Sequence, residues 1–201
     1  MTIGVAPKTE VLRKEVQEKY AEVAVNPDQT FHFRHGGPLA EILGYAMDQV
    51  DAMPPQAVES FAGVGNPFSL GAIQLGETVL DVGSGGGFDS FIAGQAVGPG
   101  GKVIGVDMTE AMLDKARGTA KQMGQEQVEF RQGFVEDMPV PDGSIDVVIS
   151  NGVINLCPDK YEAFEEVFRT LKPGGRLYLA DIVVHKPVPD AAKENVDLWT
   201  A

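Results

Sequence analysis

The stretch from Val79 to Asp89, VLDVGSGGGFD, constrains the fold of this chain more than any other part of the sequence. It starts as an apolar strand, passes through a glycine-rich turn and continues as the start of a helix. Glycine reaches backbone angles that other residues avoid and lets a ligand approach the main chain closely. The free amide groups at the start of the helix would point into the same turn. This order of elements predicts an α/β fold with a nucleoside-cofactor site at the turn.

The spacing of the glycines narrows the kind of cofactor. The dinucleotide fingerprint places glycine at the first, third and sixth positions. Counted from Gly83, the sixth position is Phe88, so the pattern is G-x-G-x-G with Asp81 two residues before it. We expect Asp81 to accept hydrogen bonds from the turn amides or to meet a ligand ammonium group through water, although it could serve only to stabilise the turn. The expected ligand contacts within the turn are Gly83, Ser84, Gly85 and Gly87.

Four more β-rich segments follow, separated by helical patterns, which predicts a doubly wound, mostly parallel sheet with helices on its faces. The expected strands are 78–82, 102–107, 127–132, 145–150 and 176–183. Thr109 is expected to cap a helix that ends at Gly124 and buries Met112, Ala116, Ala120 and Met123. Asp159 is expected to start another helix, with a core face formed by Phe164, Val167, Phe168 and Leu171.

The first 64 residues show no strand periodicity and are predicted to form a helical cap on a core of residues 65–201. Helices are expected at 9–23 and 39–53, separated by an irregular His/Gly/Pro segment at 30–38. His32 and His35 lie in this segment. Two roles remain open for it: a lid over the substrate, with a histidine as a possible base, or packing alone. No cysteine or carboxylate cluster accompanies them, so no metal site is predicted.

Composition limits the classes of partner. The chain has 201 residues, with 16 basic and 29 acidic side chains and a net charge of −13, which disfavours nucleic acid and anionic membranes as partners and suits a small molecule. One cysteine excludes an intrachain disulfide and fits a reducing compartment. No signal-peptide or membrane-spanning apolar run occurs in the sequence. We therefore expect a cytoplasmic protein; the sequence leaves its oligomeric state open.

Residues at the ends of the second and third expected strands are further candidates for cofactor binding. Asp107 lies 24 residues after Gly83, near the ~20-residue offset at which dinucleotide folds place the acid that binds ribose hydroxyls. A solvated charge before a helix is the alternative for Asp107. Met108 can lie against an adenine face through its polarizable thioether. The adenine edge would meet the loop that contains Val135 and Glu136.

These motifs carry a family resemblance. The glycine turn resembles motif I of the class I S-adenosylmethionine methyltransferases, and Ser150 to Lys160 is similar to a run found in arsenite methyltransferases, a branch that also contains quinone C-methyltransferases. Segments 103–109, 171–175 and 197–199 agree with it. The resemblance implies S-adenosylmethionine as the cofactor and methyl transfer to a small molecule. It also implies that Tyr20, four residues after Val16, closes over the methionine end of the cofactor.

The resemblance further implies a sheet of seven strands that ends in a hairpin. The sequence stops at Ala201, shortly after the fifth expected strand, so the carboxyl-terminal hairpin is apparently missing. Either the chain is a fragment, or a partner or unusual packing covers the free edge.

Methyl transfer is an in-line displacement, so the main task of the protein is to align donor and acceptor in a site closed to water. Asn151, at the end of the fourth expected strand, is predicted to face the reacting centre as a catalytic and cofactor-binding residue. His32 and His35 are the candidate bases if the acceptor must lose a proton.

The acceptor remains open. Arsenite methyltransferases hold arsenic through cysteine thiolates, but Gly152 replaces the cysteine of the family run and Cys157 is the only thiol. Three alternatives stand: an arsenite methyltransferase relative that has lost its thiolate site, a quinone-type C-, N- or O-methyltransferase, and a catalytically silent protein that binds S-adenosylmethionine.

Overall fold

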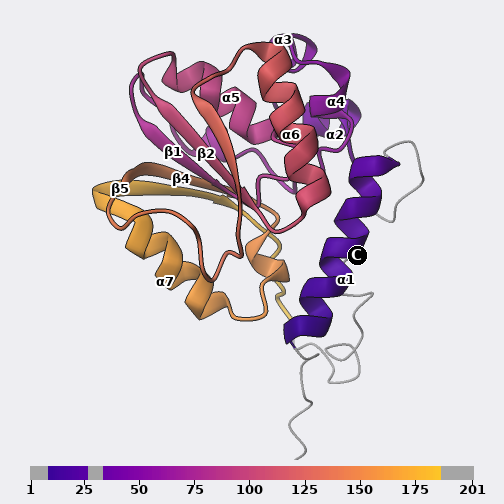
Figure 1. Cartoon of the computed structure of the whole chain (residues 1–201), viewed down its shortest axis with the longest axis vertical. Helices are drawn as coiled ribbons and strands as arrows, with labels where there is room; N and C mark the ends of the chain where they lie inside the picture. Colours follow the sequence, from indigo (N-terminus) through magenta and orange to yellow (C-terminus); the bar gives the residue numbers. More distant parts are fainter. Residues whose placement is uncertain (1–8, 27–33, 187–201) are drawn as a thin grey trace, which may run out of the picture.

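The expected strands form one sheet of five parallel strands with helices on both faces (Figure 1). The computed structural model describes residues 9–26 and 34–186. The strands lie in the order β3-β2-β1-β4-β5, and every neighbouring pair is parallel. Their bounds are Thr78–Val82 for β1, Lys102–Asp107 for β2, Val128–Gln132 for β3, Ile145–Asn151 for β4 and Leu171–Ala180 for β5. The doubly wound α/β fold is confirmed.

Alternating side chains of the strands form a hydrophobic core on each face of the sheet. Val79 and Val103 point to the face covered by α5 (Phe88–Val97) and α6 (Glu110–Met123). Leu80 and Ile104 point to the other face, where α7 (Lys160–Thr170) packs. Both faces of this parallel sheet are therefore buried, which explains why the strands are apolar at nearly every position.

The strand β5 differs from its prediction. It begins at Leu171 rather than at 176 and ends at Ala180 rather than at 183. Its pairing with β4 shifts register between Ile145, opposite Leu171, and Val147, opposite Arg176. Residues 171–175 thus form an irregular part of the strand itself. In the described part of the chain no strand pairs with the outer side of β5.

The predicted core face of α7 is wrong. The buried face of the helix is rotated so that residues next to the predicted aromatic positions face the sheet. Val167 is 3% exposed, whereas Phe168 is 81% and Phe164 41% exposed. The buried residues are Ala163, Val167 and Thr170.

Polar contacts account for this rotation of α7. Arg169 donates hydrogen bonds to the main-chain oxygens of Met138 and Val140, and Glu166 accepts one from the Met138 amide. These bonds orient the helix, so that its small side chains rather than its aromatic ones face the sheet. Asp159 caps α7 as predicted, and Gly124 ends α6 in the left-handed conformation with φ +64°. Thr109 stands at the N-cap position of α6 but its side chain makes no capping hydrogen bond, and Met123 is only partly buried.

The amino-terminal part is helical as predicted, but its second helix is broken. After α1 (Thr9–Val25), the expected helix at 39–53 is two helices, α2 (Gly37–Ile42) and α3 (Met47–Asp51), followed by α4 (Pro55–Val58) and the 3₁₀ helix η1 (Pro67–Leu70). Gly44, with φ +78°, turns the chain between α2 and α3.

Aromatic packing joins this region to the core. Tyr45 and Phe61 pack against Phe88, with ring centroids 5.1 and 4.1 Å from it. Residues from 39 to 61 therefore share one hydrophobic cluster with the sheet. In contrast, α1 lies at the side of the molecule, along α6 (Figure 1).

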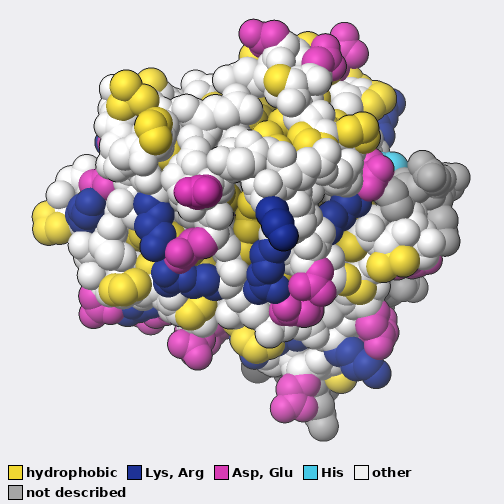
Figure 2. All heavy atoms as spheres, turned by 45° about the horizontal axis from the view of Figure 1, so that its top comes forward, with side chains coloured by type: hydrophobic (Ala, Val, Ile, Leu, Met, Phe, Trp, Pro, Cys, Tyr) yellow, Lys and Arg dark blue, Asp and Glu magenta, His cyan; other side chains and the backbone are white. Residues whose placement is uncertain are grey.

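Charged side chains of both signs are interspersed on the surface. The face in Figure 2 shows Lys and Arg beside Asp and Glu rather than one basic area. Arg176 pairs with Glu77 at 2.8 Å, and Lys172 with Asp146 at 2.7 Å. Among residues 9–26 and 34–186, no helix has the length and apolar character needed to cross a bilayer.

Candidate cofactor-binding pocket

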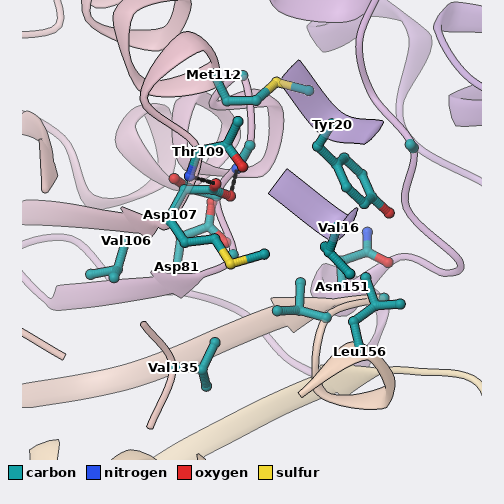
Figure 3. Close-up of a pocket in the computed structure, with 18 of the residues that line it drawn as sticks. Val16, Tyr20, Asp81, Val106, Asp107, Thr109, Met112, Val135, Asn151 and Leu156 are labelled. Atoms are coloured by element: carbon teal, nitrogen blue, oxygen red, sulfur yellow. Dashed lines mark hydrogen bonds between the residues drawn. The ribbon is translucent and has the colours of Figure 1, made fainter. Parts of the chain in front are cut away.

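A pocket lies at the carboxyl ends of β1, β2 and β4, beside the point where the strand order reverses between β1 and β4. Ligands of open α/β sheets bind in this position. Val16 and Tyr20 of α1 form one wall, and Asp81, Asp107 and Thr109 lie across from them (Figure 3). Except for the two histidines and Gly87, every residue that was predicted to take part lines this pocket.

Glycine is needed at the three spaced positions of the turn for different physical reasons. All have positive φ, +70° at Gly83, +51° at Gly85 and +90° at Gly87. A side chain at Gly83 would collide with Val153, and a Cβ atom at Gly87 would lie 2.8 Å from Phe91. At Gly85 the same atom would meet nothing within 4 Å. Gly83 and Gly87 are thus required by packing, whereas Gly85 keeps the pocket open beside the main chain.

Asp107 closes the other side of the turn. Its carboxylate accepts hydrogen bonds from the amides of Gly85 at 2.9 Å and Thr109 at 2.8 Å (Figure 3). Burial raises the pKa of Asp107, and the bonds from Thr109 and Gly85 act against this rise. Each oxygen retains a second lone pair that can accept a ligand hydroxyl. The structure therefore suits the predicted role of Asp107 without testing it.

Asp81 differs in detail from its expected role. Its hydrogen bond comes from the hydroxyl of Ser90 on α5, at 2.5 Å, and not from the turn amides. Asp89, which was not predicted, lines the same pocket. Burial, followed by the charge of Asp89, raises the pKa of Asp81 to about 8. Burial also raises the pKa of Asp89 to about 6.

Both the oxygen and the nitrogen of the Asn151 side-chain amide form hydrogen bonds with neighbouring residues. Its oxygen accepts hydrogen bonds from the amides of Val64 at 2.8 Å and Gly65 at 3.1 Å. Its nitrogen donates to the Gly65 carbonyl at 2.9 Å and to Asp89 at 3.0 Å. Asn151 therefore fastens residues 64–65 to the end of β4 as well as lining the pocket. Its catalytic role remains a prediction.

Helix α1 covers the pocket and is tied to it at both edges. Gln17 donates a hydrogen bond to the Met108 carbonyl at 2.9 Å, and Arg13 pairs with Glu136 at 3.2 Å. Tyr20, three residues after Gln17 on the same helix, is half-buried, and burial with the nearby charge of Asp107 raises its pKa to about 12. The phenol is consequently neutral over the physiological range.

The predicted bases are not part of this pocket in the described structure. The ring Nδ1 of His35 lies 3.0 Å from the Glu59 carbonyl oxygen, and His35 does not line the pocket. His32 lies outside the described residues. Cys157 does line the pocket, and burial raises the pKa of its thiol to about 12. No group of three or more His, Cys, Asp or Glu side chains suited to a metal ion occurs in the parts that the structure describes.

Two serines point to a polar ligand. The hydroxyls of Ser60 and Ser84 line the pocket, and their residues are 6% and 8% exposed. Neither hydroxyl has a hydrogen-bond partner, and buried polar groups rarely remain unsatisfied. Ser84 was predicted, but Ser60 was missed because nothing in the pattern of residues 54–62 marks it. A bound ligand with polar groups would satisfy both.

Comparison with known proteins agrees with this geometry. Residues 73–200 match the family model described as "Methyltransferase domain". The chain is 47% identical over 161 residues to an arsenite methyltransferase of Halobacterium salinarum, which covers 80% of this chain and 41% of that protein. A demethylmenaquinone methyltransferase of Lactococcus lactis is 40% identical over 102 residues, 51% of this chain and 40% of that one.

A solved structure supports the same family. The crystal structure of an arsenic(III) S-adenosylmethionine methyltransferase from Chlamydomonas reinhardtii superimposes with a TM-score of 0.67 at 37% identity, covering 73% of this chain and 51% of that one. The fold and the glycine turn define a class I methyltransferase, the class whose cofactor is S-adenosylmethionine. The chain belongs to the methyltransferase domain family and is close to the arsenite methyltransferases. It spans about two fifths of the length of the H. salinarum relative.

Proposed function

We propose that this chain binds S-adenosylmethionine in the pocket and catalyses transfer of its methyl group to a small-molecule acceptor. The main observation is the form of the glycine turn, where Gly85 opens onto the pocket and its amide donates a hydrogen bond to the half-buried carboxylate of Asp107. The two unpartnered serine hydroxyls and the buried acids also fit a cofactor that carries polar groups and positive charge.

Individual residues would hold different parts of this cofactor. When bound, the cofactor supplies an electrophilic methyl group on a sulfonium centre. Asp107 accepts hydrogen bonds from the ribose hydroxyls, and Met108 and Val135 contact the adenine. Asp81 contributes negative charge beside the cationic half of the molecule. Tyr20 and the rest of α1 exclude water from the pocket, which strengthens these electrostatic contacts.

The acceptor would enter between α1 and the segment that follows β4. Gly152, Val153 and Leu156 line this part of the pocket. The one thiol there, Cys157, is protonated at neutral pH because its pKa is raised. A protonated thiol is a poor ligand for arsenic. We therefore propose an acceptor that needs no chelation by thiolates of the described residues.

Two measurements test this function. Calorimetric titration with S-adenosylmethionine should show binding, and an assay with methyl-labelled cofactor should show label on a small molecule. Glutathione-bound arsenite and a demethylated quinol are the first two acceptors to compare. Absence of cofactor binding would contradict the proposal as a whole, and methylated arsenic would contradict the proposed class of acceptor. Binding without transfer to any acceptor would show a silent binding protein.

A further inference from the structure

Two buried carboxylates flank the glycine turn, one near the end of β1 and one in the first turn of α5. Asp81 and Asp89 both line the pocket, and both are more than nine-tenths buried. Neither forms a salt bridge with a cation of the described residues. Two cations at or beside the pocket pair with other carboxylates: Arg13, which lines the pocket, with Glu136 at 3.2 Å, and Lys115, beside Gly86 of the glycine turn, with Glu59 at 2.7 Å.

The hydrogen bonds favour ionisation of Asp89 over that of Asp81. Asp89 accepts from the Tyr45 hydroxyl at 2.7 Å and from Asn151 at 3.0 Å. Asp81 accepts from the Ser90 hydroxyl. Two full negative charges in one buried wall are unfavourable without a cation. Without a ligand, Asp81 therefore keeps a proton at neutral pH, consistent with its pKa of about 8.

The unsatisfied serines indicate independently that a polar ligand group belongs at this end of the pocket. A Cβ atom at Gly86 would lie 3.0 Å from the Ser60 hydroxyl, which places Ser60 against the glycine turn. Ser84 is part of the turn, and neither hydroxyl has a partner. Hydroxyl groups can accept from an ammonium group or donate to a carboxylate, and an amino-acid moiety presents both.

We propose that Asp89 joins Asp81 in a carboxylate pair that binds the cationic half of the cofactor, and that the proton held by Asp81 leaves to solvent when the cation binds. This inference rests on the proposed function. It assigns Asp89 to ligand binding in addition to its contacts with Tyr45 and Asn151. The balance of the step is simple: the O–H bond of the Asp81 carboxyl breaks, the cation neutralises the charge, and buffer takes up the proton.

Other titratable groups around the pair set the pH range. Asp107 on β2 adds negative charge that raises the pKa of Asp81. Burial and Asp89 raise the pKa of Tyr45, so it remains a proton donor. Because Asp81 is protonated below pH 8, the contribution of the pair to affinity rises between pH 6 and 8 and levels off above. The α-amino group of the ligand also titrates in this range. Its contribution to the measured proton number is the same for every variant at a given pH, so differences between variants report on the protein groups.

Calorimetry in two buffers of different ionisation enthalpy measures the proton directly. Titration of the purified chain with S-adenosylmethionine at pH 7 should release most of one proton, because a group with a pKa of about 8 is about nine-tenths protonated there and the ligand α-amino group takes up only a small fraction of a proton. Asp89→Asn should release less, because removing the charge at position 89 lowers the pKa of Asp81, although burial still raises it. The new amide can still accept from Asn151 and donate to Tyr45, so the fold should survive.

Three further variants separate binding from structure. Tyr45→Phe removes a hydrogen bond that favours ionised Asp89 but keeps both carboxylates, so its proton release should equal or exceed that of the unmodified chain. Asp146→Asn, whose carboxylate pairs with Lys172 outside the pocket, should match the unmodified chain. Ser90→Ala removes a bond that stabilises ionised Asp81, so at pH 8 it should release up to about half a proton more than the unmodified chain. This last variant tests the pair even if Asp89→Asn does not fold.

The outcomes are distinct. If the unmodified chain binds the cofactor without releasing a proton, or if the Asp89 and Ser90 variants release the same number as the unmodified chain, the carboxylate pair is overturned while the proposed function stands. If S-adenosylmethionine does not bind, both are overturned. Equal loss of proton release in the Tyr45 and Asp89 variants would show that the network has only a structural role.

Discussion

The two ends of the pocket are built in different ways. At the cofactor end, the glycine turn and Asp81 come from one continuous strand-turn-helix segment, and Asp107 ends the neighbouring strand. At the end that we propose for the acceptor, Tyr20, Gly63 and Asn151 come from parts of the chain far apart in sequence and meet only through packing. The first end is therefore visible as a local motif, whereas the second depends on how α1 and residues 63–65 dock. Variants can test this contrast one end at a time.

The largest expected effect is at the glycine turn. Gly85→Val should weaken binding of S-adenosylmethionine more than about 100-fold, because the new side chain enters open space beside the bound ligand. Gly143→Val is the matched control: Gly143 has φ +55° and equally open surroundings, but does not line the pocket. Both changes carry the same backbone strain, of about 1–2 kcal/mol. Equal affinities of the two variants in calorimetry would show that the turn does not cradle the cofactor.

The next effect is at the end of β2. Asp107→Ala should cost about 1.5–3 kcal/mol of binding free energy, roughly 10- to 150-fold in affinity, since it removes charge-assisted hydrogen bonds. Asp114→Ala serves as the control because that carboxylate lies exposed on the same side of the fold, on α6. An affinity within twofold of the unmodified chain would refute the ribose role of Asp107.

Helix α7 lies away from both ends of the pocket, and variants in it test how packing rather than apolar spacing selects the buried face of a helix. Val167→Ala should lower the free energy of unfolding by about 2 kcal/mol, because it leaves a cavity under the helix. Phe168→Ala, one residue further along, should change it by less than about 0.5 kcal/mol, because the ring is in solvent. Urea denaturation of both variants gives the comparison. The opposite ranking would restore the face predicted from the apolar spacing.

The smallest expected effect concerns the thiol at the acceptor end. Because burial raises the pKa of Cys157 to about 12, labelling by a thiol reagent in the native chain should be slow at both pH 7 and pH 9, with a rate that is still rising with pH at 9. In urea the thiol should be labelled much faster at both pH values, and the rate should begin to level off near pH 9, because the ordinary pKa of cysteine is about 8.5. The sequence contains one cysteine, so the signal has a single source. Fast native labelling at pH 7 would indicate an available thiolate and would favour an arsenic-binding site.

The errors of sequence reasoning share a cause. The strands β1 and β2 match their predicted bounds because buried parallel strands between turn residues are marked locally. For α7, apolar spacing was compatible with two neighbouring faces, and the contacts of Arg169 and Glu166 with residues 138–140 selected one. His35 was a candidate by residue type alone, and its ring instead contacts the Glu59 carbonyl. Ser60 and Asp89 carried no local signal, because their importance comes from neighbours distant in the chain.

The sequence by itself determined the fold class, the glycine turn and the chemical class of ligand at the cofactor end. These follow from residues within one or two elements, where backbone conformation and spacing suffice. Only the tertiary structure decided which glycine opens onto the pocket, that Asn151 is held by residues 64–65, and that Asp89 stands beside Asp81. The physical reason is burial: hydrogen-bond partners and the charge of a carboxylate depend on which distant segments exclude water from it.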